Sequence, residues 1–354
     1  MSDVDWQLLA KHIRNWSKQL GFAEVGFVNS EKSEHQSYLN EWLAKGYHGD
    51  MAYMAKHGHL RSEPASLHPG TRSIICLRLD YFQRSTEPDR VLASDSKAYL
   101  SRYALGRDYH KVIRGKLKQL SRKISDHLIE QGYEGFDARV FTDSAPLLEK
   151  AFAERAGLGW IGKNTLLLNE HAGSWFFLGE ILTNLPLPPS EKAKTNRCGS
   201  CSACMEACPT KAFTGPYQLD ARKCISYLTI EHKGSIDEPL RELMGNRIFG
   251  CDDCQLVCPW TRYSPESSEP DFSPRHNLDS STLLDLFQWT EDEFLTKTEG
   301  SAIRRAGYLG WVRNIAIALG NGPSSERILR ILKSRLGLSA LTDEHIKWAI
   351  TRLS

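Results

Sequence analysis

The sequence of 354 residues has no long hydrophobic run, no large net charge and no leader-like segment at its start. No stretch approaches the roughly 18 consecutive apolar residues of a transmembrane helix, so we expect no membrane span. Residues 1–16 contain neither a basic segment followed by an apolar run nor a twin-arginine signal. These absences predict a cytoplasmic protein.

The charges are nearly balanced, with 45 Lys and Arg against 43 Asp and Glu. A protein that binds nucleic acid through its overall charge would carry a larger basic excess, so such a partner would have to meet a local patch. One candidate lies near the end of the chain, where residues 301–354 carry nine Lys or Arg against three Asp or Glu. The length itself predicts about two or three domains.

Helix and strand patterns alternate through residues 1–188, which predicts one α/β domain. Apolar residues spaced by three and four predict helices, alternating or continuous apolar runs predict strands, and residues 98–109 read as a functional loop or a surface turn. A hairpin or turn is expected at residues 169–173. The expected helices cover residues 6–20 and 113–128, and the expected strands cover residues 22–28, 73–82, 136–141, 165–168 and 174–182.

Prolines in residues 185–192 mark the end of this domain. We expect a cysteine-rich domain over residues 189–263, a linker rich in Pro and Ser over 264–280, and an α-helical region over 281–354. Thr290 and Glu293 have the spacing of a helix capping box. The segment around WVRNIAIALGN resembles one unit of a HEAT-type helical repeat, an array that needs neighbouring units to bury its faces.

Two cysteine runs are the most specific signal in the sequence. The first follows the order C-x2-C-x2-C-x3-C-P and the second ends in the same Cys-Pro pair. This is the spacing of bacterial two-cluster ferredoxins, in which the last cysteine of each run ligates the other cluster. The runs therefore predict a ferredoxin-like domain with two 4Fe–4S clusters. A zinc site with four cysteines is the alternative, but it does not explain this order of spacings.

Counting ligands extends the prediction beyond the runs. Two cubane clusters need eight thiolates, the runs supply seven, and Cys224 supplies the eighth. Cys76 is then left over in a predicted strand, where a small buried hydrophobic residue is expected. Ferredoxin logic assigns one cluster to Cys198, Cys201, Cys204 and Cys258, and the other to Cys208, Cys224, Cys251 and Cys254.

Outside the cysteine runs, the segments 140–169, 222–234 and 245–260 resemble the epoxyqueuosine reductase family, and the resemblance covers nearly the whole chain. It implies that the α/β domain binds cobalamin, that the two clusters reduce the cobalt, and that the epoxide of a tRNA wobble nucleotide is reduced to an alkene. It also implies kinship with reductive dehalogenases. The sequence has no DxHxxG histidine motif, which agrees with a family whose cobalt lacks a protein histidine ligand.

The resemblance implies roles for individual residues. Asp143 is the expected proton donor, with a pKa raised by burial against the corrin. The alternative is that Asp143 caps the following helix; a cap at Ser144 would instead leave Asp143 free to face the cofactor. Arg61, for which a surface arginine is the alternative, is an expected cobalamin contact. The remaining expected contacts are Asp143 itself, Cys251, Ser226 and Asp252. For Ser226 and Asp252 hydrogen bonding to the cluster is the alternative.

The implied partners are the anticodon loop of a tRNA and an external electron donor, and we expect a monomer. Phosphate contacts are expected at His232, Lys233 and Arg241 and along the basic C-terminal region, for which solvated helix faces are the alternative. Two other functions fit the cysteine pattern: an electron-transfer protein whose flanking domains dock redox partners, and a cobalamin-dependent enzyme of the reductive dehalogenase type that acts on small organic molecules. The basic residues of the C-terminal region are Arg304, Arg305, Arg313, Arg327, Arg330 and Lys333.

Overall fold

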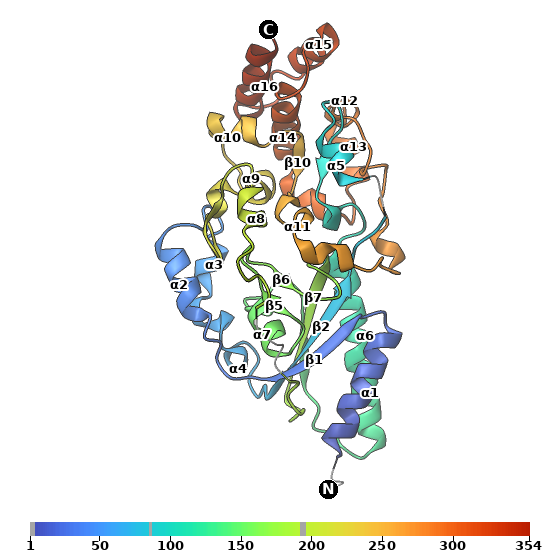
Figure 1. Cartoon of the computed structure of the whole chain (residues 1–354). Coiled ribbons are helices and arrows are strands. Elements are labelled where there is room, and N and C mark those ends of the chain that lie inside the picture. Colours follow the sequence, from blue (N-terminus) through green and yellow to red (C-terminus); the bar gives the residue numbers. More distant parts are fainter. Residues whose placement is uncertain (1–3, 85–86, 192–195) are drawn as a thin grey trace.

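The N-terminal part of the chain is built on a four-stranded sheet with the strand order β1-β2-β7-β4 (Figure 1). The computed structural model describes residues 4–84, 87–191 and 196–354. All neighbouring strands of this sheet are antiparallel, so the alternation of helices and strands along the chain gave the element order but not the strand direction. The strands are β1 (Glu24–Asn29), β2 (Ser73–Asp80), β4 (Ala138–Phe141) and β7 (Phe176–Thr183).

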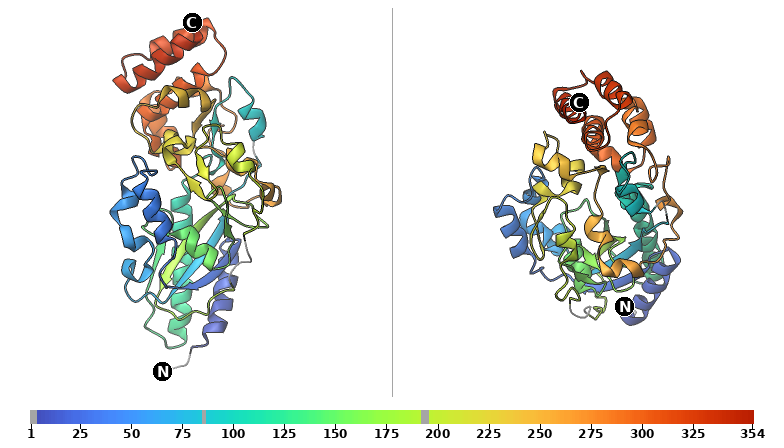
Figure 2. Two further views of the ribbon diagram at one scale, coloured as in Figure 1. Left: turned by 60° about the vertical axis from the view of Figure 1, so that its left-hand side comes forward. Right: turned by 45° about the horizontal axis from the view of Figure 1, so that its top comes forward.

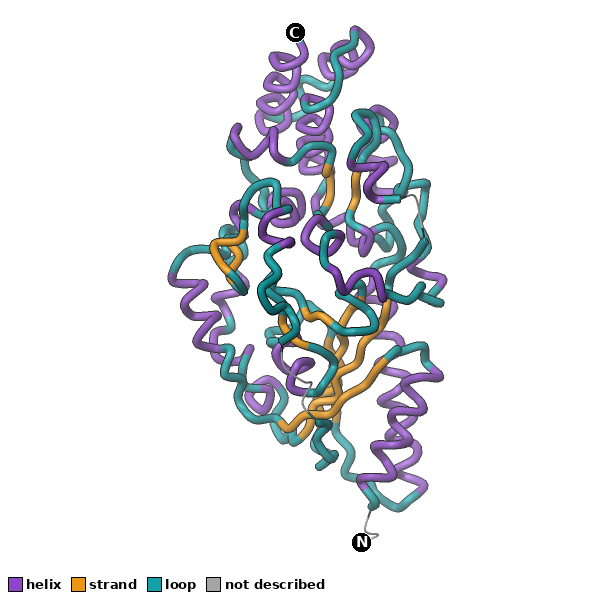
Figure 3. Tube along the Cα trace, viewed as in Figure 1, coloured by secondary structure: helices purple, strands orange, loops and turns teal. Residues whose placement is uncertain are grey.

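Helices cover both faces of this sheet. The long helices α1 (Trp6–Gln19) and α6 (Tyr109–Glu130) pack on one face, and the short helix α7 (Glu149–Arg155) packs on the other. Successive side chains of a strand point to opposite faces, so Ile181 of β7 faces α6 and the next residue, Leu182, faces α7. Both layers are visible beside the strands in Figure 3.

Shorter elements complete the N-terminal part. The strand β6 pairs with β5 and not with β7, and residues 169–173 form a turn closed by a bridge between Asn169 and Gly173. Of the hairpin and the turn expected there, the turn is observed. The elements are α2 (Gln36–Ala44), α3 (Tyr53–Lys56), η1 (Gly58–Arg61), α4 (Pro64–Leu67), α5 (Pro88–Leu92), β3 (Tyr99–Leu100), η2 (Arg102–Ala104), β5 (Trp160–Ile161) and β6 (Leu167–Leu168).

The cysteine-rich region is interlocked with the N-terminal part. Its strand β10 pairs in parallel with β3, and the backbone N–H of Asp50 donates a hydrogen bond of 2.7 Å to the Tyr227 hydroxyl. The predicted boundary segment, 185–192, ends at a residue outside the described ranges. The elements of this region are α8 (Ala203–Glu206), β8 (Phe213–Gly215), β9 (Gln218–Leu219), η3 (Ala221–Lys223), α9 (Ile225–Ile230), α10 (Glu238–Leu243), β10 (Arg247–Phe249), α11 (Asp253–Leu256) and η4 (Pro259–Tyr263).

Of the functional loop or surface turn expected at residues 98–109, the surface turn is not observed. Leu100 and Ala104 are buried in one hydrophobic core with Phe249 of β10 and with the C-terminal helices. The segment is polar and rich in turns, but it is covered because three parts of the chain meet over it. Its burial makes it a joint between the sheet, the cysteine-rich region and the helical region.

The described residues from 281 onward form helices, as predicted, and the capping box of Thr290 and Glu293 is present. The central helix of this region, α14, is buried along most of its length and packs against α12 and α16. Figure 2 shows these helices at the end of the molecule away from α1. The elements are η5 (Pro270–Phe272), α12 (Leu283–Phe287), α13 (Glu291–Lys297), η6 (Ala302–Ala306), α14 (Tyr308–Gly320), α15 (Glu326–Ser334) and α16 (Ala340–Leu353).

None of the helices in the described part of the chain combines the length and the apolar character that a bilayer crossing requires.

Candidate cluster sites and active site

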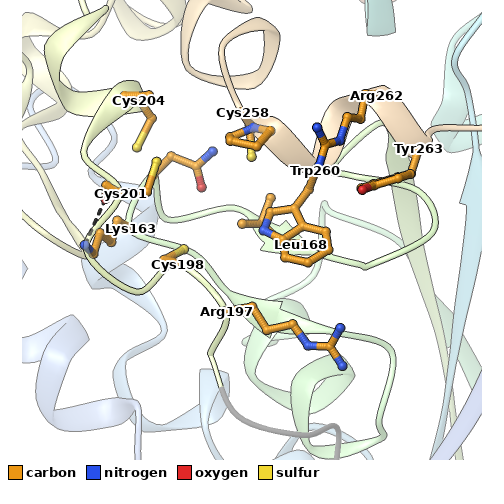
Figure 4. Close-up of a pocket in the computed structure, with 13 residues that line it drawn as sticks. Lys163, Leu168, Arg197, Cys198, Cys201, Cys204, Cys258, Trp260, Arg262 and Tyr263 are labelled. Atoms are coloured by element: carbon orange, nitrogen blue, oxygen red, sulfur yellow. Dashed lines mark hydrogen bonds between the residues drawn. The ribbon is translucent and has the colours of Figure 1, made fainter.

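Four thiols surround a cavity of about 190 Å³ between the two cysteine runs (Figure 4). The loop that carries the first of them is fixed by Lys163, whose ammonium donates to the carbonyl oxygens of Gly199 and Cys201 at 2.6 and 2.8 Å. Four soft thiolate donors around one cavity fit a cubane cluster. The four are Cys198, Cys201, Cys204 and Cys258, which is the set that the ferredoxin logic assigned to one cluster.

The other four thiols form a more deeply placed set. Cys224 is the N-cap residue of α9, and Cys208 and Cys254 are its neighbours, since burial and, after it, the charges of Cys224 and Cys208 raise the pKa of the Cys254 thiol. Burial raises the pKa of the Cys224 thiol, and so does the charge of neighbouring Cys208. Whether Ser226 contacts cobalamin or hydrogen-bonds the cluster thiolates stays a prediction. The set is Cys208, Cys224, Cys251 and Cys254.

The ninth cysteine takes no part in either set. Cys76 lies in the middle of β2 and has 0% of its surface exposed. It packs with Ile74, Leu182 and Phe152 on the α7 side of the sheet. The prediction of a small core residue at this position is confirmed.

Asp143 lies in the turn that connects β4 to α7. The preceding Thr142 anchors this turn because its hydroxyl donates to the Leu178 carbonyl at 2.9 Å. The helix α7 begins at Glu149, its N-cap is Leu148, and no side chain caps it. The alternative that Asp143 or Ser144 caps the helix is therefore wrong. The Asp143 side chain is instead 61% exposed.

Two residues of α6 hold the Asp143 carboxylate. The Tyr109 hydroxyl donates to its Oδ2 atom, and the His110 Nε2 atom lies 3.4 Å from the same oxygen. The other ring nitrogen of His110 lies 2.8 Å from Oδ1 of Asp108, which also caps α6. Tyr109 is fixed in turn by stacking on Phe177 of β7, with ring centroids 4.1 Å apart. The carboxylate is thus aimed by a helix that packs on the sheet.

The electrostatics of this group differ from the expectation for Asp143. Desolvation would raise the pKa of its carboxyl, but hydrogen bonds from His110 and Tyr109 and the charges of His110 and Arg305 outweigh it, so the pKa is lowered. Desolvation opposes the charge of His110, yet hydrogen bonds to Asp108 and Asp143 raise the pKa of His110 to about 9. At neutral pH the proton therefore resides on the imidazole beside Asp143.

The open side of Asp143 is shared by segments from all three parts of the chain. Arg305 of η6 forms an ion pair with Glu231 at 2.6 Å, and its guanidinium lies over the ring of Tyr53. The half-buried Tyr103 links this site to the cysteine-rich region, since its ring lies against Tyr109, with ring centroids 6.0 Å apart, and against Phe249 of β10, at 6.2 Å. The result is an exposed polar and aromatic surface beside the strand that precedes Cys251.

Two further residues expected to contact cobalamin have structural partners of their own. Arg61 is buried, and its guanidinium donates to the carbonyl oxygens of Met54 and Tyr53 at 3.1 and 2.7 Å, so the surface-arginine alternative is wrong. Asp252 is fully buried and accepts hydrogen bonds from the Tyr99 hydroxyl and two other donors between residues 99 and 102. Their contacts with a cofactor stay predictions.

The residues expected to bind phosphate are mostly engaged within the protein. Arg241 is buried and pairs with Glu344, which makes it a structural residue and corrects its assignment to a tRNA surface. The Lys233 ammonium donates to three backbone carbonyls, among them that of Arg305 at 2.7 Å. The His232 ring lies between Asp50 and the Ser235 carbonyl. In the helical region Arg313 is likewise buried.

The sequence analysis did not single out four residues of this site, although the segment 98–109 ended at the first of them. They are Tyr109, His110, Glu149 and Glu180. Only the first two lie next to a recognisable sequence feature. Tyr109 and His110 follow Asp108, a recognisable helix cap, but nothing local shows that this helix start faces a turn about 30 residues later.

Comparison with known proteins finds relatives that match nearly the whole chain. Residues 61–144 match the family model of the epoxyqueuosine reductase QueG, DUF1730, and residues 197–261 match that of the 4Fe-4S double cluster binding domain. The epoxyqueuosine reductase of Pseudomonas aeruginosa is 56% identical over 99% of this chain and 96% of its own length. The chain belongs to the epoxyqueuosine reductase family. The enzyme of Escherichia coli is 52% identical over 99% of this chain and 90% of its own.

Solved structures agree in fold. An epoxyqueuosine reductase in complex with an epoxyqueuosine-modified tRNA-Tyr stem loop matches with a TM-score of 0.87, 28% identity and coverage of 98% of this chain and 90% of that chain. The Streptococcus thermophilus epoxyqueuosine reductase matches with a TM-score of 0.86, 26% identity and coverage of 97% and 90%. The protein is accordingly an oxidoreductase, and the cofactors that go with its family are two 4Fe–4S clusters and cobalamin.

Proposed function

We propose that this protein reduces epoxyqueuosine in tRNA to queuosine, with Asp143 as the proton donor. In this reaction the epoxide loses its oxygen as water, an alkene forms, and two electrons and two protons are consumed. The observation that carries the proposal is the exposed Asp143 carboxylate, held by Tyr109 and His110, with Tyr103 linking this site to β10, the strand before Cys251. The tRNA stem loop bound to a related enzyme supports the substrate class.

The proton reaches the substrate through residues of this chain. His110 is protonated at neutral pH, and its Nε2 atom lies 3.4 Å from the carboxylate oxygen that also accepts the Tyr109 hydroxyl. A carboxylate supplied in this way can pass a proton to an oxygen that leaves from its exposed side. In a related enzyme from Bacillus subtilis, the catalytic loop that carries an aspartate was observed swung out of the active site. We expect the Asp143 turn to move in the same way.

The residues at the junction fit a large cofactor with polar edges. The Asp143 side chain and the Tyr53 ring are both exposed there, and Arg305 and Glu231 lie at the rim. When bound, cobalamin would supply a strongly reducing cobalt centre for the removal of the epoxide oxygen, and the clusters would supply it with single electrons. The residues that would hold it are Arg61, Asp143, Ser226, Cys251 and Asp252.

Electrons are proposed to enter from an external one-electron donor at the thiol set of Cys198, Cys201, Cys204 and Cys258. Cys201 is exposed, and the cavity of this set is rimmed by the side chains of Arg197, Trp260 and Arg262 (Figure 4). In the set around Cys224 no thiol is exposed, and its Cys251 follows β10, which Tyr103 links to the proposed reaction site. This order carries electrons inward, from the surface set to the buried set.

The anticodon loop is proposed to approach from the helical region, and the protein is proposed to act as a monomer in the cytoplasm. Arg304 and Arg305 of η6 are exposed beside the Asp143 junction, and α15 adds three exposed basic residues. Because His232, Lys233 and Arg241 are engaged internally and Arg305 pairs with Glu231, the exposed α15 residues are proposed to carry most of the phosphate contacts. The α15 residues are Arg327, Arg330 and Lys333.

The function is tested with anaerobic protein that carries both clusters, supplied with cobalamin, a low-potential reductant and tRNA containing epoxyqueuosine. We expect the released nucleoside to lose the mass of one oxygen only when cobalamin is present. Equal conversion without cobalamin would contradict the cofactor's role, and no conversion in the complete mixture would contradict the function itself.

A further inference from the structure

The short loop between β5 and β6 belongs to the N-terminal part of the chain, yet it contacts both cysteine runs. The Lys163 ammonium donates to the carbonyl oxygens of Gly199 and Cys201 at 2.6 and 2.8 Å, within the first run. The amide nitrogen of the next residue, Asn164, donates to the Cys254 carbonyl of the second run at 3.4 Å. Both side chains line the cavity of the surface set, which consists of Cys198, Cys201, Cys204 and Cys258.

The backbone of this loop is held from two sides. The Gly162 N–H donates to the Leu166 carbonyl at 2.8 Å, and the Tyr217 N–H donates to the Lys163 carbonyl at 3.0 Å. A Cβ atom at Gly162 would come within 2.5 Å of the Cδ1 atom of the buried Leu168, so the close packing of the loop requires glycine there. The Lys163 side chain therefore starts from a fixed backbone.

The positive charge of Lys163 differs from the other basic charges at this cavity. Among the described residues that line the cavity, three are basic and none is acidic. Arg197 pairs with Glu170, and the guanidinium of the exposed Arg262 lies over the ring of Tyr263 at 4.8 Å. Both acceptors of Lys163 are neutral carbonyl oxygens, so these bonds leave its charge uncompensated. Figure 4 shows this side chain against the loop that carries Cys201.

A fixed cation at a set of thiolates affects how readily the site accepts an electron. One-electron reduction adds one negative charge to a site that already carries four thiolates. The reduction potential of an iron–sulfur cluster depends on the net charge around it, on hydrogen bonds and on solvent exposure. Lys163 is half-buried, where a charge is screened less than on the open surface. Its ammonium therefore favours the reduced form of the site over the oxidised form.

We propose that Lys163 is a positioning residue of the surface set, which holds the loop of Cys198 and Cys201 and raises the reduction potential of the cluster bound there. The external donor loses one electron, the cluster gains it, and the Lys163 charge shifts this equilibrium toward the reduced cluster. The inference deepens the electron route proposed above and rests on that route for its part in turnover. Its tests measure the cluster itself, so they are independent of the reaction on tRNA.

The effect on potential is tested by titrating the cluster-loaded protein with dithionite and following both clusters by electron paramagnetic resonance. In Lys163→Gln the reduction constant of one cluster should fall about tenfold, which lowers its midpoint potential by about 59 mV, and the other cluster should be unchanged. Lys163→Arg keeps the charge and should shift the potential by less than half as much. Unchanged potentials in Lys163→Gln would overturn the proposal.

The matched control for the potential is Lys211→Gln. The Lys211 ammonium also donates to a backbone carbonyl of the cysteine-rich region, that of Glu206 at 2.6 Å, but the side chain does not line the cavity. Both potentials should therefore stay at their wild-type values in this variant. A shift equal to that of Lys163→Gln would show that any nearby positive charge has the same effect, which would contradict a specific role for Lys163.

The positioning part is tested by the rate at which EDTA removes iron. Lys163→Met loses both hydrogen bonds, so about four of its eight irons should be released several-fold faster than in the wild type, and Lys163→Arg should restore the slow rate. Loss of one cluster during purification, with the other retained, is the same result in a stronger form. Release of all iron at the wild-type rate would refute the positioning role.

The two proposals fail in distinguishable ways. If the wild type does not reduce epoxyqueuosine in tRNA, the proposed function is wrong, but the lowered potential of Lys163→Gln would still establish the role of this residue at the surface set. If the wild type is active and the potentials of Lys163→Gln are unchanged, the inference about Lys163 is wrong and the proposed function is unaffected.

Discussion

The two cysteine sets and the Asp143 site are built in opposite ways. Seven of the eight thiols come from two short runs, and each run places its ligands by turns of a few residues. The Asp143 site draws its groups from α6, the turn after β4, and η6, which are far apart in the chain. The cluster sites therefore depend on local spacing, whereas the Asp143 site depends on how the three parts of the chain pack together.

The largest effect is expected from removing a cluster ligand, which tests the sites that depend on local spacing. Cys224→Ala should reduce the iron content from about eight to about four per chain and abolish turnover, because one cubane loses a thiolate. Iron analysis with absorption spectroscopy measures this. The control is Cys76→Ala, which removes a buried thiol outside both sets and should keep both clusters. Two full clusters in Cys224→Ala would mean that another residue completes the second set.

A smaller effect on turnover is expected at the Asp143 site, which depends on packing between distant segments. The wild-type rate should fall as the pH rises through about 9, because His110 then loses the proton that its raised pKa retains. His110→Asn should lower turnover about tenfold or more at neutral pH and remove this step. Rates measured between about pH 6 and 10 with both clusters intact decide the point. If the step near pH 9 persists in His110→Asn, the proton is held elsewhere.

The stability of the fold should follow the same proton. The folded pKa of His110 lies above its ordinary value of 6.5. Its contribution to the free energy of unfolding is therefore fully present below about pH 6.5 and is lost as the pH rises through 9. Melting temperatures of the wild type should fall more over this range than those of His110→Asn. Parallel curves for the two proteins would show that the ion pair with Asp143 is absent in solution.

The smallest expected effect concerns the basic surface of α15. Replacing Arg327, Arg330 and Lys333 by Gln should weaken tRNA binding several-fold and reduce the slope of log affinity against log salt by about two. Binding titrations at several salt concentrations measure both. Lys11→Gln with Lys18→Gln, on the exposed side of α1 at the other end of the molecule, is the matched control. An equal loss in the control would show that the effect is one of net charge.

The same contrast explains what the sequence could predict. The spacing of the runs predicted the thiol set that surrounds one cavity, and counting to eight proposed Cys224 as a ligand and left Cys76 for the core, where it lies. Strands such as β2 and β7 followed from their apolar runs. In each case the information lies within a short segment, so no knowledge of the packing was required.

What failed depends on distant segments. The lowered pKa of Asp143 arises from residues on α6 and η6, and Arg241 is buried because Glu344 of α16 reaches it from 103 residues away. The segment 98–109 has the composition of a loop, yet β10 pairs with it and the C-terminal helices cover it. The resemblance to the family supplied Asp143 itself, but only the packing showed which groups hold its proton.

The central claim is that Asp143 delivers the proton, and Asp143→Asn tests it most directly. The carboxamide keeps the size of the side chain and can still contact Tyr109, but it cannot donate a carboxyl proton. We expect the variant to retain both clusters by iron content and cobalamin by absorption spectroscopy, while single-turnover conversion of epoxyqueuosine in tRNA falls by about 10²-fold or more. Conversion at the wild-type rate by the fully loaded variant would contradict the account.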